Sequence, residues 1–376
     1  MRENKLRLVA CSGRVGLAKL YDDWLQLITH ASNLCFSHYP QWYDAHLNRT
    51  SENIIFCALY RESKLVAVFP LVVEKEKSYG LVTITIPYRK LFWMPDSIVA
   101  EDEDYSYLFH FLCKNIAKTT GIKWDLFMVH GTLETSHASQ CLKGQSRFST
   151  FITKTAGCNI LRIRPYELMF DNYSGKLKKK LRKVRNKLIK MENVEFQKAR
   201  NSEDLAWAFN EYVTLEVSGW KGNQGQIKGR DKGNAMALHE TKRKFYEEIV
   251  KDFGDDELVE INLLKVGKKT IAAQITLIIV DTCFLLKIAY DEDYAKLSPG
   301  NMLLEYLLKS YQAHASIKNI CLISNYKWML DWGPEQLSYI TYEYFNKTPK
   351  GLLACTILHT KKIIKGMIRK ARTGND

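Results

Sequence analysis

Closely spaced cysteines and histidines are missing from this sequence, and their absence excludes several classes of protein. Neighbouring members of the nine Cys are at least 17 residues apart, so neither a disulfide framework nor a CxxC metal clamp is present. The nine His form no HxxxH or HxH pair, and no GxSxG segment anchors a Ser-His-Asp triad. We therefore expect reduced thiols, no metal site and no covalent intermediate on the protein.

Uninterrupted apolar runs are also scarce. The first residues, MRENKLRLVACSGR, contain no apolar run of signal-peptide length, and no lipidation signal is visible, so we expect a cytoplasmic protein. Residues 271–290 come nearest to a membrane span, but Asp281 and Lys287 interrupt them. Two strands that meet near Asp281 explain this stretch better.

The composition is that of a folded protein with an excess of positive charge. With 376 residues the chain exceeds the size of most single cores, so two domains are expected. Hydrophobic residues make up 46% and aromatic residues 12%, which excludes general disorder. The formal net charge of +14 favours phosphates or anionic lipid as partners but says nothing about chemistry.

Both halves show alternating strands and helices, and one hairpin pattern occurs twice. The segments LYRESKLVA and LLKVGKKTIA, about 205 residues apart, each place two apolar runs around a polar turn. We therefore predict an α/β (α+β) fold with two similar units, each a mixed, mostly antiparallel sheet flanked by helices.

A strongly basic helix is predicted between the two halves. In residues 176–190, nine of fifteen residues are Lys or Arg, whereas Leu177, Leu181, Val184 and Leu188 recur on one helical face. This pattern predicts a helix that docks by one apolar stripe. Its cationic face is either simply solvated or a site for a phosphate-bearing ligand, a membrane or, less in keeping with the pattern, nucleic acid.

The second half carries a more specific order of elements. A helix over 206–217 precedes the loop SGWKGNQG, a second helix near 238–250 and three antiparallel strands. The third strand, 283–290, leads into Ser298-Pro299-Gly300, after which a helix begins at about Asn301. A helix that starts with Pro and Gly presents backbone N–H groups to an anion such as a pyrophosphate. The candidate cofactor-binding residues are Ser298, Pro299, Gly300, Asn301 and Met302.

These two segments resemble the signature stretches of the CelD-type acetyltransferase domain, which is similar in fold to FemAB peptidyltransferases. Ser218, Gly219, Trp220, Lys221 and Gly225 match the pattern SGWK-x-x-x-G. The second pattern, K-x-A-Y-D-E followed by S-P-G, is matched by Lys287, Ala289, Tyr290, Asp291, Glu292, Ser298, Pro299 and Gly300. The resemblance implies two tandem GNAT-like domains and transfer of an acyl group, such as acetyl, from coenzyme A to an amine or hydroxyl of an envelope, polysaccharide or glycolipid precursor.

The resemblance also suggests boundaries. We expect a first GNAT-like domain over 1–170, the basic connecting helix over 171–200, the acyltransferase domain over 201–350 and a basic tail over 351–376. The glycine-rich phosphate loop of GNAT enzymes is reduced here to Ser-Pro-Gly, and three carboxylates precede it. An acyl carrier protein or, as in FemAB enzymes, an aminoacyl-tRNA therefore remains an alternative donor. A non-catalytic basic binding protein is the alternative from another class.

Four residues are candidates for catalysis. Glu216 could take the acceptor's proton, although a helix-end surface pair is an equally good interpretation. Lys287 lies in an apolar strand and needs a partner such as Asp291, Glu216 or a ligand. Tyr290 could protonate the leaving thiol, and Asp291 could act as a base. We predict that Glu216, Lys287 and Asp291 share one cleft.

Four more residues are candidates for substrate binding. Lys221 could hold an anionic group, and Trp220 could form a stacking wall or pack in the core. Tyr39 and Trp42, from an aromatic segment of the first half, would contribute to the acceptor cleft.

The tail over 351–372 is expected to be a basic amphipathic helix. It either packs on the second domain or lies on anionic lipid, which would place the protein at the inner face of the plasma membrane.

Overall fold

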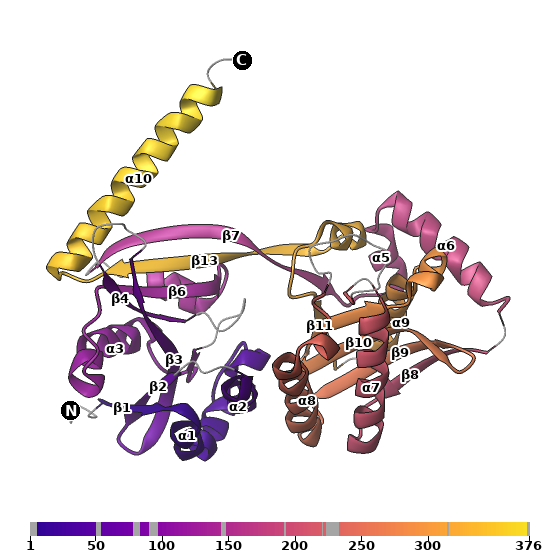
Figure 1. Cartoon of the computed structure of the whole chain (residues 1–376), viewed down its shortest axis with the longest axis horizontal. Helices are drawn as coiled ribbons and strands as arrows, with labels where there is room; N and C mark the ends of the chain where they lie inside the picture. Colours follow the sequence, from indigo (N-terminus) through magenta and orange to yellow (C-terminus); the bar gives the residue numbers. More distant parts are fainter. Residues whose placement is uncertain are drawn as a thin grey trace.

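A computed structural model describes residues 6–49, 54–77, 83–89, 97–143, 148–191, 193–219, 221–222, 233–313 and 316–373. The chain forms two lobes that two long strands connect (Figure 1). Within the described residues, no helix is both long and apolar enough to cross a membrane.

The first lobe is built mainly from residues before 165. Its strands are β1 (Leu6–Ser12), β2 (Ile55–Arg61), β3 (Lys64–Glu76), β4 (Ile84–Arg89), β5 (Ile98–Val99), β6 (Leu126–Leu133) and β7 (Ser149–Arg162). Its helices are α1 (Gly13–Ile28), η1 (Phe36–His38), α2 (Pro40–Arg49), α3 (Tyr105–Thr120) and α4 (His137–Lys143). Local sequence sets the ends of α3, because Asp104 caps its first turn and the left-handed Gly121 follows its last.

The rest of the chain supplies the second lobe and two elements, β13 and α10, that pack on the first lobe. Its strands are β8 (Val194–Ala199), β9 (Val259–Val266), β10 (Lys269–Ile279), β11 (Thr282–Tyr290), β12 (Asn319–Cys321) and β13 (Glu335–Phe345). Its helices are α5 (Tyr166–Asp171), α6 (Gly175–Leu188), α7 (Ser202–Ser218), η2 (Met236–Leu238), α8 (Glu240–Asp255), η3 (Glu292–Leu297), α9 (Pro299–Ala313), η4 (Lys327–Trp332) and α10 (Pro349–Thr373).

The predicted hairpin is present in both lobes. Arg61 pairs with Lys64 in the β2–β3 hairpin, and Val266 pairs with Lys269 in the β9–β10 hairpin. Each turn therefore has two residues, and the first of them is left-handed, with φ of 58° at Glu62 and 60° at Gly267. The prediction of the same hairpin met twice is confirmed.

The whole sheet is a near-perfect internal repeat. The described strands follow the order β1-β2-β3-β4-β6-β13-β7-β12-β11-β10-β9-β8, with β5 paired to β3 at the side. Read from either end, this order gives equivalent strands: β1 corresponds to β8, β4 to β11 and β6 to β12. The β4–β6 and β11–β12 pairs are both parallel, and α3 and α9 are the respective crossovers. The predicted fold of two similar α/β units with mostly antiparallel sheets is confirmed.

Each lobe gives its last strand to the other. β7 pairs with β12 of the second lobe, whereas β13 pairs with β6 of the first lobe. β7 and β13 also pair with each other from Glu335–Ile160 to Phe345–Ser149, and they form the arch between the lobes in Figure 1. β13 lies inside the range 201–350 that we predicted to be the second domain, but its partners are strands of both lobes. The boundaries at 170, 200 and 350 stay a prediction.

Helices cover both faces of the sheet. In the second lobe, α7 and α8 lie on one face, and α9 with α6 covers the other. The buried face of α6 consists of Leu177, Leu181, Val184 and Leu188, as its periodicity predicted. The α7–α8 face continues into the first lobe, because α2 packs directly on α8.

Helix α10 follows β13 and therefore lies on the first lobe. Ala354 and Cys355 are buried against a cluster that includes Phe151 and Phe345. The expectation that this tail packs on the second domain is corrected: strand exchange brings its start to the first lobe. Beyond these turns the helix extends away from the sheet (Figure 1).

Candidate active site

Strand β11 loses its neighbour halfway along its length. It pairs with β12 only over Thr282–Phe284, although it continues to Tyr290. A bulge lies at this point, because Ile275 pairs with Lys287 but the next residue, Thr276, pairs with Leu285, which leaves Leu286 without a partner on β10. One edge of β11 therefore faces an opening between the strands instead of β12.

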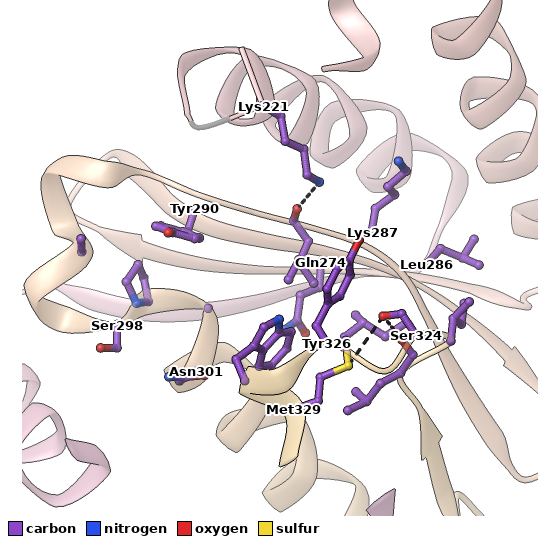
Figure 2. A pocket seen from close by; sticks show the side chains of 18 of the residues that line it. Lys221, Gln274, Leu286, Lys287, Tyr290, Ser298, Asn301, Ser324, Tyr326 and Met329 are labelled. Carbon is purple, nitrogen blue, oxygen red and sulfur yellow. Dashed lines mark hydrogen bonds between the residues drawn. The ribbon is translucent and has the colours of Figure 1, made fainter. Parts of the chain in front are cut away.

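A cavity of about 910 Å³ occupies this opening. It reaches both faces of the sheet, since Lys242 of α8 lines it from one side and Lys180 of α6, with the first turn of α9, lines it from the other. Figure 2 shows Lys221 and Lys287 on one side of it and Ser298 and Asn301 on the other. The lining residues are Lys180, Lys221, Asn234, Lys242, Gln274, Leu285, Leu286, Lys287, Ile288, Tyr290, Ala295, Ser298, Pro299, Gly300, Asn301, Leu322, Ile323, Ser324, Tyr326, Trp328 and Met329.

The N-terminus of α9 opens onto the cavity. Ser298 is left-handed, with φ of 46°, and the carbonyl of Ser298 accepts the N–H groups of Asn301 (2.9 Å) and Met302 (3.1 Å). The Ser298 side chain is buried, and its Oγ has no hydrogen-bond partner among the described residues. Ser298, Pro299, Gly300 and Asn301 line the cavity, whereas Met302 points into the core.

Glu216 lies beneath the cavity wall, in a closed network. Its Oε1 accepts hydrogen bonds from Tyr212 Oη (3.0 Å) and Lys221 Nζ (3.0 Å), and its Oε2 accepts one from Met236 N (2.8 Å). Lys221 Nζ also donates to the carbonyl of Ile288 on the open edge of β11 (2.8 Å; dashed in Figure 2). Glu216 thus holds Lys221 against that strand.

The charges around Glu216 keep it ionised. Burial acts to raise the pKa of its carboxyl, but the Lys221 charge, the Met236 N–H and the Lys287 charge outweigh burial and hold the pKa below its ordinary value. A carboxylate with both oxygens engaged and a lowered pKa is a poor proton acceptor. This geometry suits a positioning residue better than a general base.

Lys287 and Asp291 do not meet at the cavity. Lys287 lines it and places Nζ 4.8 Å from the centre of the Tyr246 ring. Asp291 instead accepts the N–H of Asp293 (2.9 Å) and pairs with Lys269 Nζ (2.6 Å) at the start of β10. Of the three residues that we predicted to share one cleft, only Lys287 lines the cavity. Glu216 lies behind the wall, where the Lys287 charge still lowers its pKa, and Asp291 caps η3.

Tyr290 is the candidate proton donor that does line the cavity. Burial, and then the charge of Glu292, raises the pKa of its phenol above the ordinary value. The phenol is therefore protonated at neutral pH.

The aromatic candidates of the first lobe lie elsewhere. Trp42 packs on Phe245 of α8 with ring centroids 5.3 Å apart, and Tyr39 packs on Phe253 at 5.8 Å. Trp42 of α2 and Tyr39, which precedes this helix, both belong to the contact with α8, and neither lines the cavity. Trp220 and Gly225 fall outside the described residues.

The lining is strongly cationic. Lys180, Lys221, Lys242 and Lys287 contribute to it, and no Asp or Glu does among the described residues. Five further lining residues were not predicted from the sequence: Lys180, Lys242, Gln274, Tyr326, which precedes η4, and Trp328 within it. The basic run around Lys180 was a signal, but nothing local connects η4 to β11. In the described part of the chain, no group of three or more His, Cys, Asp or Glu side chains could hold a metal ion.

The sequence of the second lobe matches a known family. Residues 175–324 match the acetyltransferase (GNAT) domain, so this lobe is a GNAT domain and the protein is an acyltransferase of the GNAT superfamily. The match ends before β13 and includes every element around the cavity except η4. No curated protein sequence matches the chain.

Solved structures share the two-lobed fold over 89–91% of the chain. FemX is 11% identical, with 91% of this chain and 99% of that chain covered and a TM-score of 0.57. The C-terminal domain of a putative lysylphosphatidylglycerol synthetase from Agrobacterium fabrum is 9% identical (90% and 96% covered, TM-score 0.51). L-PGS from Bacillus licheniformis is 12% identical (89% and 95% covered, TM-score 0.50). At these identities the likeness shows the fold alone.

Proposed function

We propose that the protein transfers an acyl group, such as acetyl, from a coenzyme A thioester to an amine or hydroxyl of an anionic envelope or polysaccharide precursor. The observation that carries this proposal is the Ser298 hydroxyl, which has no hydrogen-bond partner among the described residues and is buried at the N-terminus of α9, at a cation-lined cavity. The two sequence motifs support a place in the CelD-type branch of the superfamily.

The donor's pyrophosphate would lie at the first turn of α9. Helix N-terminal N–H groups favour an anion, and Gly300 lets it approach closely. The corresponding helix of the first lobe, α3, is unsuitable, because the Asp104 carboxylate already caps it and Glu101, Asp102 and Glu103 precede it. This asymmetry supports a single donor site, in the second lobe.

Transfer would be direct. The acceptor's nitrogen or oxygen attacks the thioester carbonyl, the carbon–sulfur bond breaks, and Tyr290 protonates the departing thiolate. The acceptor's proton passes to solvent, from which Tyr290 regains a proton. Glu216 positions Lys221, which fixes the open edge of β11. Lys221, Lys242 and Lys287, which line the cavity, favour an acceptor that carries phosphate or carboxylate.

Calorimetric titration with coenzyme A, followed by acyl transfer with Tyr290→Phe, tests this proposal. The wild type should bind coenzyme A, and Tyr290→Phe should retain that affinity while kcat falls about 100-fold. A wild type that binds no coenzyme A would refute the donor; unchanged kcat would refute the role of Tyr290.

A second candidate donor, aminoacyl-tRNA, is supported by α6. Its exposed cations include Lys179 and Lys183, and the neighbouring Lys180 reaches the cavity. If tRNA is the donor, binding should weaken steeply with salt, and Lys179→Gln with Lys183→Gln should reduce the salt dependence. Binding of coenzyme A or an acyl carrier protein, with no affinity for tRNA, decides against it.

We further propose that the protein works in the cytoplasm at the inner face of the membrane. Support comes from α10, whose outer surface exposes Leu353, Ile363 and Ile364 in a segment rich in Lys and Arg.

A further inference from the structure

We infer that Gln274 recognises an amide of the donor's phosphopantetheine arm and so makes the site specific for pantetheine thioesters. This inference rests on the proposed function, because it names one contact of the proposed donor. The starting observation is a buried carboxamide with unsatisfied hydrogen-bonding capacity at the middle of the cavity.

Gln274 is only 1% exposed, and its Oε1 has no hydrogen-bond partner in the described part of the chain. Asn262, directly opposite it on β9, is fully buried, and neither its Nδ2 nor its Oδ1 has a partner among these described residues. Gln274 lines the cavity, whereas Asn262 does not. Buried amides without partners are destabilising, so the one that faces a cavity is a candidate for satisfaction by a ligand.

The position of Gln274 lies on the path of the donor. Its neighbour Ala273 packs on the α7–α8 side and Ala272 packs on the α9 side, so alternation directs Gln274 toward α9. It is paired with Ile288, on the open edge of β11. Figure 2 shows it between Tyr290 and Ser324. A donor with its phosphate at α9 and its thioester in the opening must pass this side chain.

A pantetheine arm has the chemistry that this position needs. Each of its amides offers an N–H and a C=O, and a carboxamide can satisfy both. The apolar residues Leu285, Leu322 and Met329, which line the same cavity, suit the methylenes between these amides. The ester of an aminoacyl-tRNA has no such arm.

Titration of the full-length protein with two probes tests the inference. Coenzyme A contains the arm, and adenosine 3′,5′-bisphosphate lacks it. Gln274→Leu should weaken coenzyme A binding about tenfold, because an amide of the ligand loses its partner in a buried site, and should leave the bisphosphate affinity unchanged. Its thermal midpoint should be equal to or higher than that of the wild type, since an unsatisfied amide is removed from the core.

Asn262→Leu is the matched control, because it removes a buried unpartnered amide outside the cavity. It should leave both affinities unchanged. If Gln274→Leu binds coenzyme A as the wild type does, or loses both probes equally, the inference is wrong while the proposed donor stands. If the wild type binds no coenzyme A, the proposed function fails and the inference fails with it.

Discussion

Gly300 occupies the first turn of α9, where the donor's phosphate is proposed to bind. A Cβ added there would meet only Tyr290 Cδ1, at 4.0 Å, so a side chain fits without displacing the backbone. Gly300→Val should therefore fold normally but weaken coenzyme A binding by about tenfold or more, because the added methyl groups occupy the anion's place. Calorimetry and thermal unfolding measure both.

Gly175→Val provides the control, since Gly175 opens α6 and a Cβ there meets nothing within 4 Å. It should change neither affinity nor stability appreciably. Unchanged donor affinity in folded Gly300→Val would remove α9 from the donor site.

Lys221 and Glu216 form an ion pair, and the stability lost when Lys221 is replaced should depend on pH. In the wild type the folded-state pKa of Glu216 is lowered, so its contribution to stability is present above the unfolded pKa and is lost as the pH falls through the folded one. Lys221→Met leaves a buried carboxylate without its nearest cation, which should cost about 3 kcal/mol. Burial then raises the pKa of Glu216, so this loss should be full at pH 8 and smaller at pH 5.

Denaturant unfolding at both pH values measures the effect. The double variant Glu216→Gln with Lys221→Met carries neither charge. Its loss of unfolding free energy relative to the wild type should therefore be nearly the same at pH 5 and pH 8. An equal loss at pH 5 and pH 8 in Lys221→Met would mean that Glu216 is not the charge that Lys221 compensates.

Single residues were predictable where they broke a local pattern. Lys287 is a charge within an apolar strand, and it does line the cavity. Gln274 breaks its own strand in the same way but is neutral, and a buried Gln is compatible with many partners. Tyr39 and Trp42 gave a misleading signal, because an aromatic cluster has the same appearance in a sequence whether it binds sugars or joins two lobes.

Among the elements, α10 offers a test of membrane contact. Its first turns bury Ala354 and Cys355, so a truncation must spare them. Removal of the residues after Thr360 takes away Ile363 and Ile364, which are 55% and 49% exposed, and most of the cations of the tail. The full chain should sediment with anionic vesicles at low salt, through apolar burial and about 1 kcal/mol per cation, and the truncated chain should not.

Neutral vesicles and 0.5 M salt are the controls, since each removes the electrostatic contribution. Both chains should have the same thermal midpoint. If the full chain stays in the supernatant with anionic vesicles, α10 is not a membrane element.

Elements defined by neighbouring residues were accessible from the sequence. The two hairpins, the basic helix with its stripe of Leu177, Leu181, Val184 and Leu188, and the start of α9 all follow from short-range signals. The lobe on which α10 packs does not follow from such signals, because it depends on the position of β13 in the sheet.

At the scale of the molecule, the strand exchange predicts that neither lobe is complete alone. A fragment of residues 1–164 leaves β6 and β7 without β13 and should aggregate, because long unpaired edges remain. Coexpression with residues 165–376 should give a soluble complex. Size-exclusion chromatography of the separate and coexpressed fragments checks this.

A fusion protein provides the control. Arg162 and Glu335 form an ion pair at 2.8 Å, which shows that the end of β7 lies beside the start of β13. Joining residues 334–361 to residue 164 through a short glycine linker should restore solubility to the first lobe. A monomeric, folded 1–164 fragment would contradict a structural need for β13.

The exchanged strands also set the order of events on the ribosome. Local hairpins and helices of the first lobe can form as they emerge, but its sheet lacks an inner strand until residues 335–345 have been made. The sheet of the N-terminal lobe therefore stays incomplete until almost the entire chain has been synthesised. Pairings between strands so far apart in the sequence also form slowly. Synthesis and folding are uncoupled here, so chaperone demand should fall on the lobe that is translated first.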